Sequence, residues 1–299
     1  MLKLRLLIIV LTGMVLFTSI MCTTQNNLDN IFYAQNTFNK LSNSPQTASE
    51  KAKLLKAIGF DGLEGFGYEG FFELKDAIAN EGLVMPVNYV GIDFETDGNL
   101  NDTLITEIKE MIKASSKGAI VYFYLRSKSF TNNTETETGD KVIGAILRDL
   151  ADYALPFGVK LGVYPHINMY CETVEHSVRL ANIVDRNNFG AVMNLCHLLK
   201  VEGSEGIEEK IEMFTPFLIA VNINGADDGD TKNLGWDRLI QPLDQGTFDT
   251  YGFVKLLKDN GYNGPFGLQS YNIEGDFVET LSQSMKTWNE YKERYTKEN

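Results

Sequence analysis

Apolar runs of about four to eight residues alternate along most of the chain with longer stretches whose apolar positions recur at helical spacing. The short runs predict strands at Ile31–Phe38, Gly62–Phe66, Val84–Val90, Ile120–Leu125, Lys160–Pro165, Gly190–Leu195, Leu218–Ile223 and Phe266–Ser270. The amphipathic stretches predict helices at Ala48–Ile58, Phe71–Asn80, Leu104–Ala114, Lys141–Leu155, Val174–Val184, Gly206–Phe214, Phe248–Lys258 and Phe277–Tyr295. The pattern therefore predicts eight strands that alternate with helices.

Glycine marks the end of several predicted helices, at Gly59, Gly82, Gly118, Gly158 and Gly261. Glycine adopts the left-handed conformation that ends a helix at little cost. Strands that alternate with helices of this length form βαβ units with right-handed crossovers and a parallel sheet. Eight such units predict an α/β chain folded as a single (β/α)8 TIM barrel. The first strand is not followed by Gly-x-Gly-x-x-Gly, which argues against a dinucleotide-binding fold.

The first 21 residues resemble an export signal, with a basic start, an apolar centre at Leu6–Phe17 and a polar sequel. A membrane-anchor helix is the alternative, but Thr12-Gly13 interrupts an apolar run that is already shorter than the ~20 residues a spanning helix needs. Cys22 stands where a bacterial lipoprotein carries its lipidated cysteine, although Met21 is larger than the residue expected there. We predict a signal peptide at 1–21, a tether at 22–30 and the barrel at 31–299. The protein is then exported, either periplasmic or a membrane-tethered lipoprotein of a bacterial cell.

Composition and charge narrow the choice of partners. The sequence is 43% hydrophobic and 22% charged, as expected of one α/β domain after removal of a leader. Its net charge is −13 from 27 basic and 40 acidic residues, and loss of Lys3 and Arg5 with the leader makes it −15. Such a surface disfavours nucleic acid, anionic membranes and phosphorylated substrates. A membrane would be reached only through the N-terminal signal or a lipid anchor.

Two cysteines, Cys171 and Cys196, remain outside the predicted leader region. In an exported chain they could pair. A domain of this size does not need a disulfide for its stability, so we expect two buried free thiols.

Uncharged polar side chains stand at the ends of the later strands: His166, Asn194, His197, Asn222 and Gln269. In a closed parallel barrel these ends meet on one rim, where active sites are built. Because none of these residues is a carboxylate, the rim suits a polyhydroxylated ligand better than a tightly bound divalent ion. The two histidines are the rim groups that titrate near neutrality.

Other residues near strand ends are further candidates. Glu64, at the end of strand two, is the nearest carboxylate and is either catalytic or an anchor in a salt bridge or hydrogen bond. We predict substrate contacts from Asn36, Tyr89, Arg126 and Lys200, and stacking on a sugar ring by aromatic residues such as Tyr89.

Two further residues are predicted to have structural roles. His176 lies on a predicted helix and is expected to be an ordinary, hydrogen-bonded histidine. Asp249 is placed to cap the helix that follows it.

Two predicted loops are long enough to be candidates for a lid or a binding loop. Ser127–Asp140 follows strand four, and Asp227–Thr247 follows strand seven and carries Trp236. Loops of this length are often lids or binding loops in a compact domain. A mobile, solvated excursion is the alternative, and for Ser127–Asp140 the sequence favours neither.

The stretch Leu239–Gln269 carries the most specific motifs. It begins Leu-Ile-Gln-Pro-Leu-Asp-Gln-Gly-Thr-Phe-Asp and ends Gly-Tyr-Asn-Gly-Pro-Phe-Gly-Leu-Gln. It resembles the xylose-isomerase-like barrel superfamily, the sugar phosphate isomerase/epimerase group, whose members have Pro-Leu-Gly-x-Gly-x-x-Asp, a helix and Gly-Tyr-x-Gly-Pro there. The resemblance spans about residues 31–295, and the segments around His166 and His197 add to it.

The resemblance implies which positions would hold the family's Mn²⁺ or Mg²⁺ ion. These positions are Tyr164, Asn194, Asn222 and Gln269 in this chain, where metal-binding members have mainly Glu, Asp and His. Amides and a phenol are poor ligands for hard divalent ions. The expectation is no metal site and no cofactor, although weak binding of a divalent ion stays open. Tyr164 could serve as an acid if a neighbour lowered its pKa.

The resemblance also implies a function. His166 and His197 match positions that contact substrate in the family, and we predict them, with Glu64, as catalytic. The expected activity is that of a sugar isomerase or epimerase that acts on a carbohydrate or keto-sugar by metal-independent proton abstraction next to a carbonyl. The alternatives are a non-catalytic sugar-binding barrel and a keto-glycoside lyase. Metal-dependent hydrolysis of nucleic acid, as in the endonuclease branch, is opposed by the charge and by the missing ligands.

Overall fold

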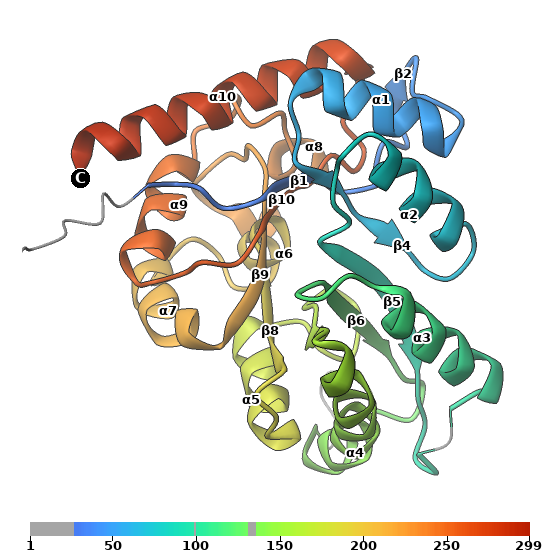
Figure 1. Ribbon diagram of the computed structural model, residues 1–299. Coiled ribbons are helices and arrows are strands. Elements are labelled where there is room, and N and C mark those ends of the chain that lie inside the picture. Colours follow the sequence, from blue (N-terminus) through green and yellow to red (C-terminus); the bar gives the residue numbers. More distant parts are fainter. Residues whose placement is uncertain (1–26, 99, 131–135) are drawn as a thin grey trace, which may run out of the picture.

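Parallel strands form a ring at the centre of the computed structural model, which describes residues 27–98, 100–130 and 136–299 (Figure 1). The hydrogen-bonded order is β3–β1–β10–β9–β8–β7–β6–β5–β4. These strands are β1 (Phe32–Ala34), β3 (Gly62–Leu63), β4 (Gly65–Phe66), β5 (Val87–Asp93), β6 (Ile120–Arg126), β7 (Lys160–Val163), β8 (Phe189–Asn194), β9 (Leu218–Ile223) and β10 (Phe266–Leu268). The predicted signal peptide, Cys22 and the start of the tether lie outside the described residues.

The second predicted strand is split at Glu64 into β3 and β4. β3 pairs with β1, whereas β4 pairs with β5 and places Phe66 opposite Tyr89. β3 and β4 thus lie at the two ends of the hydrogen-bonded order and together close the ring. They share one strand position, so the nine labelled strands correspond to the eight strands of the barrel. This confirms the α/β class and the single (β/α)8 barrel. A Cβ at Gly62 would lie 2.2 Å from the carbonyl oxygen of Val84, so the close approach of these strands requires glycine.

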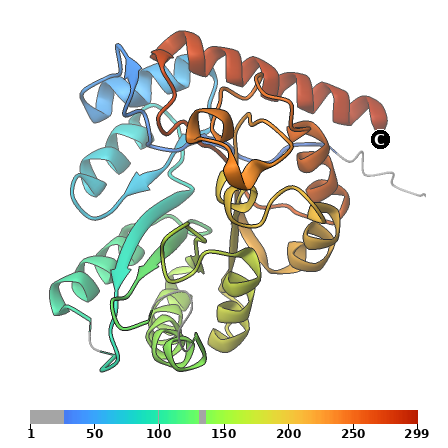
Figure 2. The ribbon, with the colours of Figure 1, turned by 180° about the vertical axis from the view of Figure 1, so that it is seen from behind.

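Helices surround the ring in both views (Figures 1 and 2). They are α1 (Ala48–Ile58), α2 (Phe71–Asn80), α3 (Asp102–Ala114), α4 (Thr136–Ala154), α5 (Val174–Val184), α6 (Leu195–Val201), α7 (Ile207–Phe214), α8 (Trp236–Leu239), α9 (Thr250–Asp259) and α10 (Phe277–Glu298). Short 3-10 turns are η1 (Leu155–Phe157), η2 (Thr215–Phe217) and η3 (Thr231–Asn233). A small parallel sheet joins β2 (Leu41–Ser42) to β11 (Gly275–Asp276). In the described residues no helix is both long and apolar enough to cross a bilayer.

Local signals explain where helices begin and end. Gly59 ends α1 at φ 108°, and its N–H donates to the carbonyls of Leu55 and Lys56. Gly158 ends the η1 turn at φ 67°. Asp249 caps α9 as predicted, because its side chain accepts a hydrogen bond from the N–H of Gly252.

Several predicted boundaries are wrong. The strand predicted at Val84–Val90 runs from Val87 to Asp93, because Pro86 has no N–H to donate to the ladder. The strand predicted from Ile31 to Phe38 ends at Ala34. The sequence pattern also missed α6 and α8, which are only seven and four residues long.

The long loops are more structured than the sequence indicated. α4 begins at Thr136 rather than Lys141, which shortens the Ser127–Asp140 loop, and residues 131–135 lie outside the described part. The Asp227–Thr247 segment contains η3 and α8, and its Asp227 carboxylate accepts hydrogen bonds from Arg238 and Gln241. This segment is therefore a folded loop rather than a solvated excursion.

Asp140 joins α4 to α5 from a buried position. Its Oδ1 accepts 2.7 Å hydrogen bonds from the Tyr170 hydroxyl and from Nε2 of His176, and its Oδ2 accepts one from Nε of Arg179 at 2.7 Å. Asp140 is 2% exposed. The structural role predicted for His176 is thus confirmed. Burial alone would raise the pKa of Asp140. The hydrogen bond and the charge of His176, together with the hydrogen bonds from Tyr170 and Arg179, outweigh it and lower the pKa overall.

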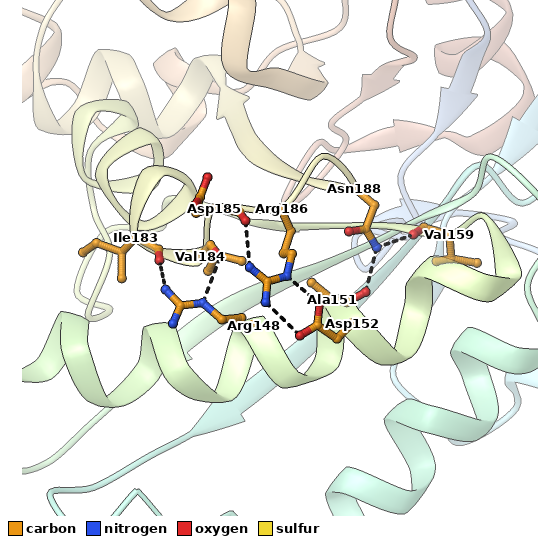
Figure 3. Close-up of polar contacts among 9 residues, drawn as sticks. All are labelled: Arg148, Ala151, Asp152, Val159, Ile183, Val184, Asp185, Arg186 and Asn188. Atoms are coloured by element: carbon orange, nitrogen blue, oxygen red, sulfur yellow. Dashed lines mark hydrogen bonds and ion pairs between the residues drawn. The ribbon is translucent and has the colours of Figure 1, made fainter.

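At the end of the barrel where the strands begin, polar contacts join α4 to the end of α5 and to the turn before β8 (Figure 3). Arg148 donates to the carbonyl oxygens of Val184, at 3.1 Å, and of Ile183. Arg186 pairs with Asp152, and the Nδ2 of buried Asn188 donates to the carbonyl of Ala151 at 2.8 Å. In a barrel of this kind the N-terminal ends of the strands serve stability, so these contacts leave the other rim free for chemistry.

Aromatic side chains fill the interior of the ring. Tyr33, Tyr122 and Tyr164 are buried there together with Val87, Ile120, Val192 and Ala220. Two larger apolar clusters fill the space between the strands and the helices. Cys171 and Cys196 are both buried and free, as predicted.

Candidate functional site

The C-terminal ends of the strands deliver the predicted site residues to one rim. Asn194 is the last residue of β8, Asn222 lies near the end of β9, and His166 and Gln269 follow β7 and β10. Glu64 occupies the break between β3 and β4. The structure therefore brings the predicted polar residues of strands two and five to eight to the same end of the barrel.

Glu64 is a buried carboxyl held by neutral hydrogen-bond donors. Its Oε1 accepts hydrogen bonds from the Tyr122 hydroxyl and from Nε2 of Gln35 at 3.1 Å, and its Oε2 accepts one from the N–H of Asn36 at 3.3 Å. Burial raises the pKa of Glu64 to about 7, against the lowering effect of these three hydrogen bonds. Near neutral pH this group can therefore either take up or release a proton.

The stability of the protein is expected to fall as pH rises from about 4.5 to about 7, because of Glu64. The unfolded chain loses this proton near the lower value, whereas the folded state keeps it up to the higher one, so the folded state binds more protons in between. The cost of ionising the buried carboxyl reaches on the order of 3 kcal/mol above this window. The measurement is the free energy of unfolding in urea, for the wild type and for Glu64→Gln, at about pH 4.5 and at about pH 7. A wild type and variant with the same pH dependence would contradict the expectation.

Five tyrosines lie near this carboxyl, on β1, β5 and β6 and just after β7: Tyr33, Tyr89, Tyr122, Tyr124 and Tyr164. Ring centroids of Tyr89 lie 5.5 Å from Tyr122, 4.7 Å from Tyr124 and 4.8 Å from Tyr164, and the Tyr33 hydroxyl donates to Oδ1 of Asn222 at 2.8 Å. Burial raises the pKa of Tyr164 well above its usual value. The condition under which Tyr164 could act as an acid, a pKa lowered by a neighbour, is therefore not met, and the phenol stays a protonated hydrogen-bond donor.

His166 and His197 lie against each other, with ring centroids 4.1 Å apart. Nδ1 of His166 donates to the carbonyl oxygen of Ile167 at 2.7 Å, which leaves Nε2 as an acceptor. Burial lowers the pKa of His166. The pKa of His197 is well below its usual value, mainly because of burial and to a lesser extent because of the charge of His166. Both imidazoles are therefore neutral at neutral pH. His197 also contacts the Trp236 ring at 5.6 Å.

The residues at the family's metal positions do not fit a divalent ion. Each amide oxygen already accepts hydrogen bonds from the protein: Asn194 Oδ1 from Cys196 Sγ at 2.9 Å, Asn222 Oδ1 from Tyr33, and Gln269 Oε1 from Thr37 Oγ1 at 2.8 Å and Tyr271 N at 2.9 Å. The fourth position, Tyr164, is a protonated phenol. In the described part of the chain no group of three or more His, Cys, Asp or Glu side chains is placed to hold a metal. Hard cations need charged oxygen ligands, which this donor set lacks.

Three other predicted substrate-binding residues have protein partners. Oδ1 of Asn36 accepts a hydrogen bond from Lys51 at 3.1 Å, and Arg126 forms an exposed ion pair with Asp93. Nζ of Lys200 donates to the carbonyl oxygens of Lys232 and Leu234, both at 2.8 Å. Lys200 thus anchors α6 to the Asp227–Thr247 loop, and its contact with substrate stays a prediction.

The mouth of the barrel has two chemically different sides. Ring contacts run without a break from Phe66 through Tyr89, Tyr164 and His197 to Trp236, at centroid separations of 5.6, 4.8, 5.8 and 5.6 Å. On the other side, β1, β9 and β10 and the residues just after them contribute amides from Gln35, Asn222 and Gln269. Several buried polar atoms have no hydrogen-bond partner within the described residues: Gln35 Oε1, Asn222 Nδ2, His197 Nδ1 and Ser270 Oγ. An apolar face opposite hydrogen-bonding groups is the complement of a sugar ring.

Gln35 and Trp236 are site residues that the sequence reasoning missed. A signal for Gln35 was present, because it lies two residues after Tyr33 and so faces the same side of the strand. Trp236 carried no such signal, since its place depends on how the Asp227–Thr247 loop folds against α6.

Comparison with known proteins identifies the family. A family model described as xylose isomerase-like TIM barrel matches residues 52–291. The apo crystal structure of 3-keto-D-glucoside 4-epimerase YcjR from E. coli is similar, with a TM-score of 0.67 and 18% identity over 87% of this chain and 99% of that one. An L-ribulose 3-epimerase has a TM-score of 0.67 and 13% identity over 89% of this chain and 96% of that one.

A third solved structure, the IOLI protein with a bound zinc atom, has a TM-score of 0.66 and 17% identity over 88% of this chain and 98% of that one. No curated relative matches the chain. At these identities the solved structures establish the fold, and the family model covers most of the sequence. The chain belongs to the xylose isomerase-like TIM barrel family.

Proposed function

We propose that this protein is an exported sugar isomerase or epimerase that removes a proton next to a carbonyl without a metal ion. The observation that carries the proposal is the buried Glu64 carboxyl, whose pKa of about 7 suits a general base, at a mouth with an aromatic and an amide side. Export is supported by the basic and apolar start of the sequence. Two proteins of similar structure, a 3-keto-D-glucoside 4-epimerase and an L-ribulose 3-epimerase, are consistent with a carbohydrate substrate.

Glu64 is the proposed base. In the described structure its Oε2 accepts one hydrogen bond, the 3.3 Å bond from Asn36, and so keeps a lone pair for a proton. In the proposed step the carboxylate takes the proton from the carbon next to the carbonyl, and the electron pair moves onto the carbonyl oxygen. The same proton, or one from solvent, then returns to a carbon of the enediolate. General base catalysis of this kind is worth about 10²–10⁴-fold in rate.

The oxygen that becomes negative needs hydrogen-bond donors, since the site has no cation to stabilise it. Nδ2 of Asn222 is buried and has no partner among the described residues. The Tyr164 hydroxyl accepts a hydrogen bond from Nδ2 of Asn194 and therefore keeps its own proton to donate. We assign these two groups to the enediolate oxygen, and we assign Nε2 of His166 to accept a hydrogen bond from a substrate hydroxyl.

One observation favours the second candidate, a sugar-binding barrel without catalysis. Glu64 is only 1% exposed, so a substrate has to displace Gln35 or Asn36 before it meets the carboxylate. Incubation in D₂O with a panel of aldoses, ketoses and 3-keto-sugars, followed by NMR, separates the two candidates. Loss of a carbon-bound proton signal is expected for the enzyme, and an elimination product would identify a keto-glycoside lyase. Binding of a sugar without any exchange would contradict the enzymatic proposal.

A further inference from the structure

Phe66 is an exposed aromatic residue at the mouth of the barrel. It is the last residue of β4 and is 52% exposed. Its ring lies 5.6 Å from that of Tyr89, the residue opposite it on β5. A single exposed apolar side chain is ordinary in a soluble protein. Phe66 differs because it continues the aromatic surface of the candidate site outward.

Gly91 makes this surface continuous. A Cβ at this position would lie 2.5 Å from the Tyr124 ring, so the glycine allows Tyr124 to lean across β5 from β6. The Tyr124 ring then lies 4.7 Å from that of Tyr89. Aromatic surface thus extends from Tyr122, buried beside Glu64, through Tyr89 to Tyr124 and Phe66 at the edge of the mouth.

Polar groups border the outer part of this surface. The guanidinium of Arg126 lies 5.3 Å from the centroid of the Tyr124 ring and is paired with Asp93 on the neighbouring strand. Both side chains are substantially exposed, at 50% and 66%. Because the pair has no net charge and offers both hydrogen-bond donors and acceptors, this edge suits an uncharged ligand with hydroxyl groups, and the chain's net charge of −13 opposes an anionic one.

We propose that Phe66 and Tyr124 form a subsite for a second, uncharged pyranose ring, so that the substrate is a glycoside rather than a free monosaccharide. This inference rests on the proposed function, because it assumes that the first ring lies against Tyr89 beside Glu64. The second ring places its C–H face on the Phe66 and Tyr124 rings and its hydroxyl groups toward Arg126 and Asp93. The site then selects substrates by length as well as by the sugar that reacts.

Calorimetric titration with matched ligands tests the subsite. The ligands are methyl glucosides against maltose and cellobiose, methyl β-galactoside against lactose, and phenyl β-glucoside as an aromatic aglycone. At least one disaccharide should bind roughly tenfold more tightly than its methyl glycoside, the gain expected from burying about half of one ring face. Phe66→Ala should remove this gain, and Phe66→Trp should keep it. Phe217→Ala is the matched control, because this phenylalanine is 37% exposed but lies in η2, just before β9, at the opposite end of the barrel.

Each other outcome overturns the proposal. Equal affinity for disaccharides and methyl glycosides, or a gain that survives Phe66→Ala, would exclude the subsite. Tight binding of the phenyl glycoside without a gain for any disaccharide would show a general apolar patch instead. Binding or proton exchange with single-ring sugars alone would leave the proposed function intact and reject the second ring. Neither binding nor exchange with any ligand would reject both.

Discussion

Replacement of Glu64 by glutamine is expected to slow proton exchange between substrate and D₂O by about 10²–10⁴-fold at neutral pH. Glutamine has the same shape and keeps one oxygen for the hydrogen bonds from Tyr122 and Gln35, but its amide nitrogen cannot accept the bond from Asn36 and the side chain cannot take up a proton. The wild-type rate should rise with pH through about 7, where the carboxyl ionises, and the residual rate of the variant should lack this rise. The measurement is NMR of the carbon-bound proton in D₂O across this pH range.

Glu95→Gln is the matched control for this substitution. Glu95 is another carboxylate just beyond the end of β5, where it accepts hydrogen bonds from the N–H groups of Lys128, at 3.0 Å, and Ser129, at 2.9 Å. It has no role in the proposed chemistry, so exchange should stay near the wild-type rate. Far-UV circular dichroism verifies that both variants fold. A folded Glu64→Gln protein with undiminished exchange would show that another group is the base.

Asp140→Ala is expected to destabilise the protein by about 3–5 kcal/mol, the usual effect of removing one member of a buried ion pair. The substitution leaves the Tyr170 hydroxyl and Nε2 of His176 without their acceptor. It also loosens the segment that carries His166, whose N–H donates to the carbonyl of Cys171 next to Tyr170. The measurement is the free energy of unfolding in urea.

Asp152→Ala provides the comparison, because Asp152 pairs with Arg186 on the opposite end of the barrel but its side chain is 49% exposed (Figure 3). Its loss should destabilise the protein far less than the loss of Asp140, because an exposed ion pair is screened by solvent. The difference between the wild type and Asp140→Ala should also depend on pH. The pKa of Asp140 lies below its usual 3.8, so its contribution is complete above that value and is lost as pH falls through the lower, folded-state pKa. Equal effects of the two substitutions would contradict the role of Asp140.

The sequence predicted the barrel because two independent patterns agree. Apolar periodicity placed the helices and strands, and glycines such as Gly59 and Gly158 marked where helical segments end. The split of strand two at Glu64 has no local signal, since it arises only when β3 and β4 find different partners around the closed ring. The early start of α4 at Thr136 also depends on residues distant in the sequence. The first turns of this helix contain Asp140, whose carboxylate accepts hydrogen bonds from Tyr170, His176 and Arg179.

The candidate site was predictable where it depends on topology. The ends of parallel strands must meet, and so Asn194, Asn222 and Gln269 reach one rim. The direction of a side chain beyond a strand end depends on the next element, which the sequence did not show. Asn194 caps α6, and this helix carries Lys200 to the backbone of the Asp227–Thr247 loop. The raised pKa of Glu64 likewise depends on its burial beside Gln35 and Tyr122, which are 29 and 58 residues away in the sequence.

The central claim is that the buried Glu64 carboxyl removes the proton while uncharged amide and phenol donors stabilise the resulting oxyanion, with no metal ion. It is tested by measuring proton exchange in D₂O after exhaustive chelation, with elemental analysis of the same sample, and again after addition of Mn²⁺. We predict the same exchange rate before and after chelation, substoichiometric metal, and no acceleration by Mn²⁺. Loss of exchange on chelation, with recovery in proportion to one bound Mn²⁺ per chain, would contradict the account.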